Sequence, residues 1–139
     1  MPEYPPRYAV TADAIITRIN GSQKEIVLIK RANPPFKGEY ALPGGFVDPD
    51  ETVEQACIRE ALEETSLEVE IGSLVGIYSA PGRDPRGRTI TAAFLCMVKD
   101  GELQPSDDAA EANWIKASQL GAMRLAFDHA MIVKDAKLT

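Results

Sequence analysis

The stretch that decides the fold is GFVDPDETVEQACIREALEETSL, which runs from Gly45 to Leu67. Thr52 and Gln55 stand three residues apart, as in a capping box, where each side chain bonds the backbone of the other residue. This pair predicts a helix that begins just after Thr52 and continues to about Thr65. The Pro- and Gly-rich residues before the pair predict an irregular entry to that helix.

The predicted helix carries three glutamates on one face. A helix turns about 100° per residue, so Glu60, Glu63 and Glu64 project in similar directions. Like charges at this spacing cost roughly 0.2–0.5 kcal/mol per pair, which indicates that a cation offsets them. Magnesium suits the site because it prefers carboxylate oxygens and bridges to phosphates. The alternative is a solvated acidic face that pairs with Arg59.

The spacing of charged and glycine residues in this stretch is more specific than the acidic face alone. It resembles the signature of the Nudix hydrolases, and the matching positions are Gly45, Glu51, Arg59, Glu60, Glu63, Glu64 and Leu67. The resemblance implies a metal site made by Glu60, Glu63, Glu64 and the main-chain carbonyl of Gly44. It also implies that Arg59 and Glu51 orient the ligands. Magnesium is the expected metal, with manganese as the alternative.

Ser66 is the one departure from the signature, which has a glycine at that position. A glycine there normally adopts the left-handed conformation that ends a helix. A serine in the same backbone should cost about 1 kcal/mol, unless the turn after the helix is redrawn.

The remaining sequence predicts strands and one further helix. Together with the signature, these elements predict an α/β fold, a Nudix-type α/β/α sandwich with a mixed β-sheet between helices, as a single Nudix hydrolase domain over residues 1–139. The expected elements are a hairpin of Tyr8–Ile19 and Glu25–Arg31 with its turn at Asn20-Gly21, an irregular loop over Asn33–Gly45, strands over Leu67–Ser79 and Thr89–Lys99, an acidic loop over Asp107–Glu111, a short strand over Ala112–Lys116 and a helix over Leu125–Lys137.

The loop between the two later strands is the main indication of the substrate. Pro81 lies 14 residues after Leu67, and this placement is similar to that of the Nudix group that cleaves ADP-ribose. The guanidinium groups of Arg83, Arg86 and Arg88 can donate paired hydrogen bonds to phosphate oxygens. The alternative is a rigid, solvated hairpin tip. The expected substrate-binding residues are Arg83, Arg86, Arg88, Pro81 and Phe36, with Tyr8 and Tyr40 as further aromatic candidates for stacking.

A carboxylate outside the helix is usual in this family, as a metal ligand or as the base that activates water. Glu111 is the first choice for this carboxylate, and Asp107 and Asp108 are the competing candidates. The alternative is that all three are solvated surface residues without a catalytic role. The expected catalytic residues are therefore Glu60, Glu63, Glu64, Arg59 and Glu111. His129 is the single histidine, and a packing role is favoured over a substrate contact.

The leading functional hypothesis is metal-dependent hydrolysis of ADP-ribose to AMP and ribose 5-phosphate. The first alternative is a pyrophosphohydrolase of nucleoside triphosphates, including oxidised ones. It would use the same helix and release pyrophosphate. The second is a non-enzymatic ADP-ribose sensor, which would bind the ligand without turnover. We expect that sensors of this kind carry a DNA-binding domain and that this sequence has no room for one.

Composition limits the partners and the compartment. With a formal net charge of −6, binding to nucleic acid is not expected, because such binding relies on basic patches. No apolar run reaches the length of a membrane span, and the start of the chain lacks a secretory signal, which predicts a cytoplasmic protein. Cys57 and Cys96 are expected to be buried free thiols. The expected partner is a small nucleotide-sugar substrate, and the family resemblance makes a homodimer plausible.

Overall fold

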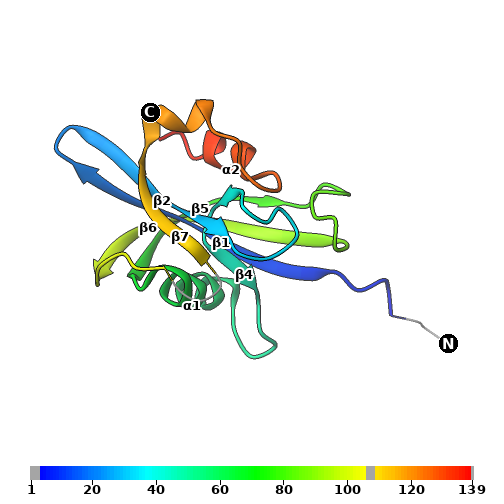
Figure 1. Ribbon diagram of the computed structural model, residues 1–139. Coiled ribbons are helices and arrows are strands. Elements are labelled where there is room, and N and C mark those ends of the chain that lie inside the picture. The colour runs from blue at the N-terminus through cyan, green and yellow to red at the C-terminus, as the bar shows by residue number, and fades with distance from the viewer. Residues whose placement is uncertain (1–3, 106–108, 139) are drawn as a thin grey trace.

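The computed structural model describes residues 4–105 and 109–138. It is a mixed β-sheet with helices on both faces, in agreement with the predicted α/β/α sandwich (Figure 1). The elements are β1 (Ala9–Asn20), β2 (Gln23–Arg31), β3 (Tyr40–Ala41), β4 (Gly44–Phe46), α1 (Val53–Thr65), β5 (Glu68–Tyr78), β6 (Thr89–Asp100), β7 (Ala109–Lys116), the 3₁₀ helix η1 (Ala117–Ala122) and α2 (His129–Asp135).

Strand β1 lies at the centre of the sheet. Its main path runs β3-β2-β1-β6-β5, β4 also pairs with β1, and β7 pairs with β2. The β1–β6 pair is parallel and the other pairs are antiparallel. The predicted hairpin is confirmed, because Asn20 of β1 pairs with Gln23 of β2 across a two-residue turn.

The two faces of β1 build separate cores because successive side chains of a strand point to opposite sides. Ala12, Ala14 and Ile16 pack in the core beneath α1. Ile15 packs in the core with η1 and α2 on the other face. Figure 1 shows α1 and α2 on opposite sides of the sheet. Many residues under α1 are small, so the helix can lie close to the strands.

Helix α1 begins as predicted. Thr52 is its N-cap, the Gln55 N–H donates to Thr52 Oγ1 at 3.1 Å, and the Thr52 N–H donates to Gln55 Oε1 at 2.8 Å. The helix ends at Thr65, and Ser66 follows in the left-handed conformation with φ 65° and ψ 11°. The backbone of the family signature is therefore kept, although a serine replaces the glycine.

We expect Ser66→Gly to raise the free energy of unfolding by about 0.5–1 kcal/mol. It removes the roughly 1–2 kcal/mol penalty of a left-handed L-residue, while the extra freedom of glycine in the unfolded chain offsets part of the gain. Urea denaturation measures the change. The matched control is Ser79→Gly, at an exposed serine without a left-handed backbone, and it should lower stability. Equal losses in the two variants would contradict this prediction.

Two predicted loops differ from the structure. The loop over Asn33–Gly45 contains the short strands β3 and β4, which pair only because distant β2 and β1 provide partners. The acidic loop over Asp107–Glu111 is wrong at its end, because β7 begins at Ala109 and includes Glu111. Asp107 and Asp108 lie outside the described residues.

The last helix is shorter than predicted. It covers His129–Asp135, whereas the prediction began at Leu125. Phe127 adopts a left-handed backbone with φ 53°, which interrupts helical geometry. The Ala126 N–H donates to the Tyr40 carbonyl at 2.8 Å, so this segment runs beside β3 before α2 begins. Helix η1 was not predicted.

Both cysteines are buried and free, as predicted. Cys57 of α1 contacts Cys96 of β6 with their sulfur atoms 3.7 Å apart. Both are part of the core beneath α1. In the described residues, no helix has both the length and the apolar character needed to cross a membrane.

Candidate active site

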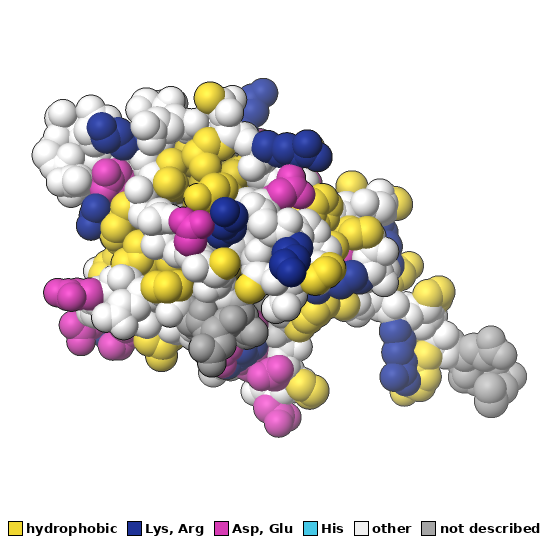
Figure 2. Space-filling model, viewed as in Figure 1, with side chains coloured by type: hydrophobic (Ala, Val, Ile, Leu, Met, Phe, Trp, Pro, Cys, Tyr) yellow, Lys and Arg dark blue, Asp and Glu magenta, His cyan; other side chains and the backbone are white. Residues whose placement is uncertain are grey.

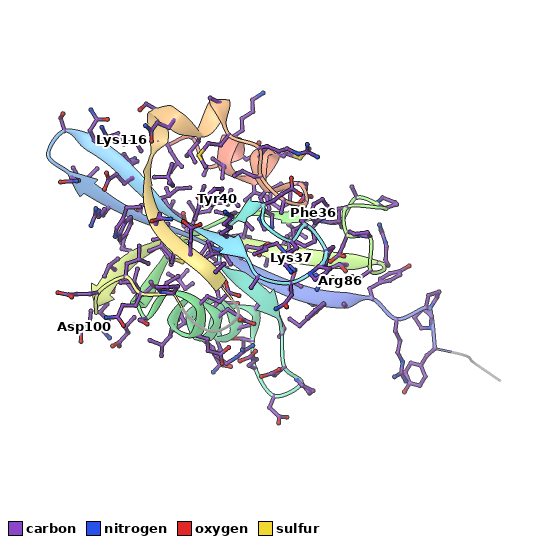
Figure 3. The ribbon with its side chains drawn as sticks, viewed as in Figure 1. Phe36, Lys37, Tyr40, Arg86, Asp100 and Lys116 are labelled. Atoms are coloured by element: carbon purple, nitrogen blue, oxygen red, sulfur yellow. The ribbon has the colours of Figure 1, made fainter. Side chains whose placement is uncertain are left out.

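A cavity of about 320 Å³ opens where α1, β4, the loop over residues 79–88 and the start of α2 meet. Its volume lies in the range typical of small-ligand pockets. Figure 3 shows the labelled Phe36 and Arg86 toward one end of the sheet, far from Lys116 and Asp100. The charged, aromatic and histidine residues that line the cavity are Asp13, Arg31, Phe46, Glu60, Glu64, Arg83, Asp84, Arg86, Phe127 and His129.

Two of the three predicted glutamates face this cavity. Glu60 and Glu64 stand one helical turn apart on α1, and both contribute to the cavity wall. Glu63 points differently: its side chain is 57% exposed, and its Oε2 accepts a hydrogen bond from Arg59 Nη1 at 3.2 Å. The structure therefore brings Glu60 and Glu64 together and holds Glu63 at the side of Arg59.

Negative charge on the carboxyl groups in the cavity is unfavourable. Burial and the neighbouring Glu60 raise the pKa of Glu64 to about 9, against a hydrogen bond from the Gly44 N–H. Burial likewise raises the pKa of Glu60, and Arg59 opposes this effect. A divalent cation would offset both charges, and hard cations prefer such oxygen donors.

The donor set therefore fits a cation, but it is not fully assembled. Within residues 4–105 and 109–138, no group of three His, Cys, Asp or Glu side chains is arranged to hold a metal ion. Glu60 and Glu64 are in place. For Glu63 to join them, its carboxylate must leave Arg59.

Glycines bring the β4 backbone against these carboxylates. A Cβ atom added at Gly45 would collide with the carboxylate of Glu60. One added at Gly44 would collide with the carboxylate of Asp13 and come within 2.5 Å of the Ala12 carbonyl oxygen. The Gly44 N–H also donates to Glu64 Oε2 at 3.3 Å. Only residues without a side chain allow this close approach.

Arg59 organises the outer side of the glutamate face. Its Nη2 donates to Glu51 Oε1 at 2.6 Å and to the Phe46 carbonyl at 3.0 Å, while Nη1 lies 3.4 Å from Glu60 Oε2. The hydrogen bond from Arg59 lowers the pKa of Glu51 to about 2. The role of Arg59 and Glu51 in orienting the metal ligands stays a prediction.

The three predicted loop arginines have different surroundings. Arg83 lines the cavity, but its side chain is only 4% exposed and forms a two-pronged pair with Asp128, at 2.9 and 2.6 Å. Arg86 also lines the cavity, is 41% exposed, and pairs with the buried Asp84 at 2.8 Å. The guanidinium carbon of Arg88 lies instead 5.3 Å from the ring centre of Tyr8.

Other predicted contacts lie outside the cavity wall. Phe36 packs on the lining residue Phe127, with ring centres 4.7 Å apart. Pro81 is exposed in the loop, and Tyr40 belongs to β3. None of Phe36, Pro81, Arg88, Tyr8 and Tyr40 is part of the described cavity lining. Their roles in substrate binding stay predictions.

Glu111 lies on β7, where it pairs across the sheet with Lys30 of β2. Its Oε2 is 3.3 Å from Lys30 Nζ, and its side chain is 47% exposed. Glu111 does not belong to the described lining of the cavity. A role in activating water therefore stays a prediction, and it requires Glu111 to leave Lys30.

Sequence reasoning missed several lining residues. Arg31 ends β2, and its Nε donates to the Pro35 carbonyl at 2.6 Å. Its guanidinium carbon lies 5.1 Å from the ring centre of Phe127, and that of Arg86 lies 5.6 Å from the same ring. Asp13 was missed because it sits within an apolar strand. A charged residue inside such a strand was the available signal.

The comparisons with known proteins agree with this geometry. The NUDIX domain family model matches residues 7–136. An ADP-ribose pyrophosphatase of Methanocaldococcus jannaschii is 51% identical over 127 residues, which are 91% of this chain and 72% of that protein.

Two solved structures are also similar. The NUDIX domain of Shewanella oneidensis NrtR complexed with ADP ribose has a TM-score of 0.84 and 28% identity over 95% of this chain and 88% of that one. A bifunctional NMN adenylyltransferase/ADP ribose pyrophosphatase of Francisella tularensis, complexed with AMP and a manganese ion, has a TM-score of 0.80 and 32% identity over 92% of this chain and 40% of that one.

Together the fold and the glutamate-lined cavity define a Nudix-type site. The chain belongs to the NUDIX family, which confirms the resemblance inferred from Gly45 to Leu67 and the assignment to the Nudix hydrolases.

Proposed function

We propose that this protein hydrolyses the diphosphate linkage of ADP-ribose to AMP and ribose 5-phosphate with the help of Mg²⁺ or Mn²⁺. The observation that carries the proposal is a cavity that contains both carboxylates for cations and guanidinium groups for phosphates. The similarity to the Methanocaldococcus ADP-ribose pyrophosphatase and to the ADP-ribose complex supports the choice of substrate.

In this proposal Glu60, Glu63, Glu64 and the Gly44 carbonyl hold the cations. When bound, the cations supply Lewis acidity at the phosphorus oxygens and favour ionisation of water. The low exposure of Glu60, at 14% of its side chain, limits competing solvent. Arg59 holds the carboxylates of Glu60 and Glu63 on its own side through an ion pair and a hydrogen bond, and Glu63 exchanges that hydrogen bond for the cation.

The guanidinium groups bind the anionic substrate. Arg31 is anchored through Nε to the Pro35 carbonyl, which directs its terminal nitrogens as donors to a diphosphate. Arg86 is fixed by Asp84 and lies 4.8 Å from the ring centre of Phe46. The terminal nitrogens of Arg31 can donate to phosphate oxygens, whereas Asp84 already accepts from Nε and Nη2 of Arg86, which leaves Nη1 as the main free donor of Arg86. Phe46 and Phe127 line the same cavity and offer surfaces for the base or the sugar.

The alternative of a nucleoside triphosphate pyrophosphohydrolase predicts different products. Purified protein with Mg²⁺ is incubated in separate reactions with ADP-ribose, with ATP and with an oxidised guanosine triphosphate. The products of each reaction are identified by chromatography. We expect AMP and ribose 5-phosphate from ADP-ribose at the highest kcat/KM. Faster release of pyrophosphate from a triphosphate would overturn the choice of substrate, and tight binding of ADP-ribose without turnover would favour the sensor.

We further propose a cytoplasmic homodimer that does not bind nucleic acid. The free thiols Cys57 and Cys96 suit a reducing compartment. The edge strand β5 exposes Leu74 and Ile77, which offer an apolar surface to a second copy. Figure 2 shows Lys and Arg side chains scattered among Asp and Glu on one face. Light scattering of Leu74→Glu against the unaltered protein tests the dimer.

A further inference from the structure

The backbone that leads into β4, from Leu42 to Gly44, is held by three different elements at three successive residues. The Leu42 N–H donates to His129 Nδ1 of α2 at 3.0 Å. The Pro43 carbonyl accepts from the Ala14 N–H of β1 at 2.8 Å, and the Gly44 N–H donates to Glu64 Oε2 of α1 at 3.3 Å. In the first of these bonds, a side chain of the C-terminal helix accepts from the backbone two residues before Gly44.

The imidazole of His129 is fixed in orientation. It is 4% exposed, and its ring centre lies 5.3 Å from that of Phe127. Because Nδ1 accepts a hydrogen bond, the neutral ring carries its proton on Nε2. Nε2 lies 3.7 Å from Asp13 Oδ2, which itself accepts from Thr91 Oγ1 at 2.7 Å. The hydrogen bond at Nδ1 therefore orients the ring, and Nε2 faces Asp13 beyond hydrogen-bond distance.

The residue before His129 is bound to another residue that lines the cavity. Asp128 binds the guanidinium of Arg83 through both carboxylate oxygens. Arg83 belongs to the loop over residues 79–88, which also presents Arg86 to the cavity. Asp128 and His129 thus connect that loop to the backbone that leads to Gly44.

We propose that His129 is a positioning residue for the metal site. The hydrogen bond from the Leu42 N–H to His129 fixes the position of the Gly44 backbone. Because Asp128 binds Arg83, the same segment also fixes that backbone relative to the loop over residues 79–88. This inference rests on the proposed function only in assigning the Gly44 carbonyl to a cation. Leu42 is 2% exposed, so without His129 its N–H loses its partner away from water, and the segment must shift to find another.

The sharpest test compares His129→Asn with His129→Leu. The asparagine Oδ1 stands near the place of Nδ1 and can accept from the Leu42 N–H, whereas leucine cannot. We expect the leucine variant to bind Mn²⁺ about tenfold more weakly in calorimetry without substrate, as is typical when a partner of a metal ligand is lost. The asparagine variant should stay within about threefold of the unaltered protein on the same basis.

Two further readouts separate positioning from general destabilisation. In the metal-free protein, hydrogen exchange of the Leu42 amide should be fast in His129→Leu and slow in His129→Asn. At saturating Mn²⁺ the leucine variant should recover most of its kcat. If His129→Leu does not fold, His129→Gln replaces it, because its acceptor lies one bond farther out, and the same contrast with asparagine is expected.

Equal Mn²⁺ affinity in the leucine and asparagine variants would overturn the inference, as would slow exchange of the Leu42 amide in both. Failure of the unaltered protein to bind Mn²⁺ at all would instead count against the proposed function, and the two failures are therefore distinguishable.

Discussion

Glu64→Gln should lower kcat/KM for ADP-ribose by a factor of about 10²–10³ while leaving the metal-free protein as stable as before or more stable. A cation at a phosphoryl centre contributes several kcal/mol to the transition state, and each 1.36 kcal/mol corresponds to a factor of ten in rate. Glutamine keeps the shape and the acceptor for the Gly44 N–H, but it is a much poorer ligand for a hard cation.

The higher stability expected for metal-free Glu64→Gln follows from the burial of the Glu64 side chain in the cavity. In the metal-free protein its carboxylate is largely buried beside Glu60. Because its pKa is raised to about 9, Glu64 takes up a proton when the metal-free protein folds at neutral pH, and glutamine avoids this cost of about 1 kcal/mol or a few degrees in Tm. Added Mg²⁺ should stabilise the unaltered protein and should not stabilise the variant, because only binding to the folded state raises Tm.

Glu54→Gln is the matched control for this prediction. Glu54 lies on the exposed side of the same helix, so its substitution should change neither turnover nor the effect of Mg²⁺ on Tm. Kinetics with varied ADP-ribose and thermal melts with and without Mg²⁺ provide both readouts. Turnover of Glu64→Gln within about threefold of the unaltered protein would contradict the assignment of Glu64 as a ligand, since several kcal/mol are expected.

Helix α1 shows why part of this site was readable from the sequence. Its capping box involves Thr52 and Gln55, three residues apart, and the common face of the glutamates depends only on helical geometry. For Ser66 the sequence left two alternatives, a left-handed serine or a redrawn turn, and the structure has the left-handed serine. The family signature is compact, so one stretch specified both the helix and its chemistry.

The rest of the cavity depends on contacts between distant segments. Arg83 was predicted to reach a phosphate, yet Asp128 lies 45 residues away in sequence and occupies its guanidinium group. Glu111 was predicted in a loop, but the register of β7 against β2 places it opposite Lys30. Strand pairing and salt bridges of this range are set by tertiary packing, and a single sequence does not report them.

Arg31 is a cavity residue that sequence reasoning did not select, because its position also depends on contacts between distant segments. In sequence it is only a charged residue at the end of an apolar strand. It becomes a cavity residue because the chain turns back at residues 33–39, and the Glu39 carbonyl accepts from the Arg31 N–H at 3.0 Å. The wall formed by Arg31, Arg86 and Phe127 unites three segments that no local pattern relates.

Alanine in place of the two adjacent glycines of β4 should impair the protein in two different ways. Gly45→Ala should lower kcat/KM by about 10–100-fold with little loss of stability. Its Cβ collides with the carboxylate of Glu60, which can rotate away but then no longer points at the cation, and misplaced ligand support typically costs that much. A higher Mg²⁺ requirement should accompany the loss.

Gly44→Ala should instead destabilise the fold by about 1–3 kcal/mol, the usual cost of overpacking. Its Cβ would come within 2.5 Å of the Ala12 carbonyl oxygen and 3.0 Å of the Asp13 Cα. Backbone atoms of the central strand cannot rotate away, so β4 must separate from β1.

Gly121→Ala is the control, because a Cβ there meets no atom within 4 Å. Urea denaturation and Mg²⁺-dependent kinetics of all three variants check the pattern, and an equal loss of stability in Gly44→Ala and Gly45→Ala would contradict it. The contrast follows from what each Cβ meets: a side chain that can move without unfolding the sheet, or a strand that cannot.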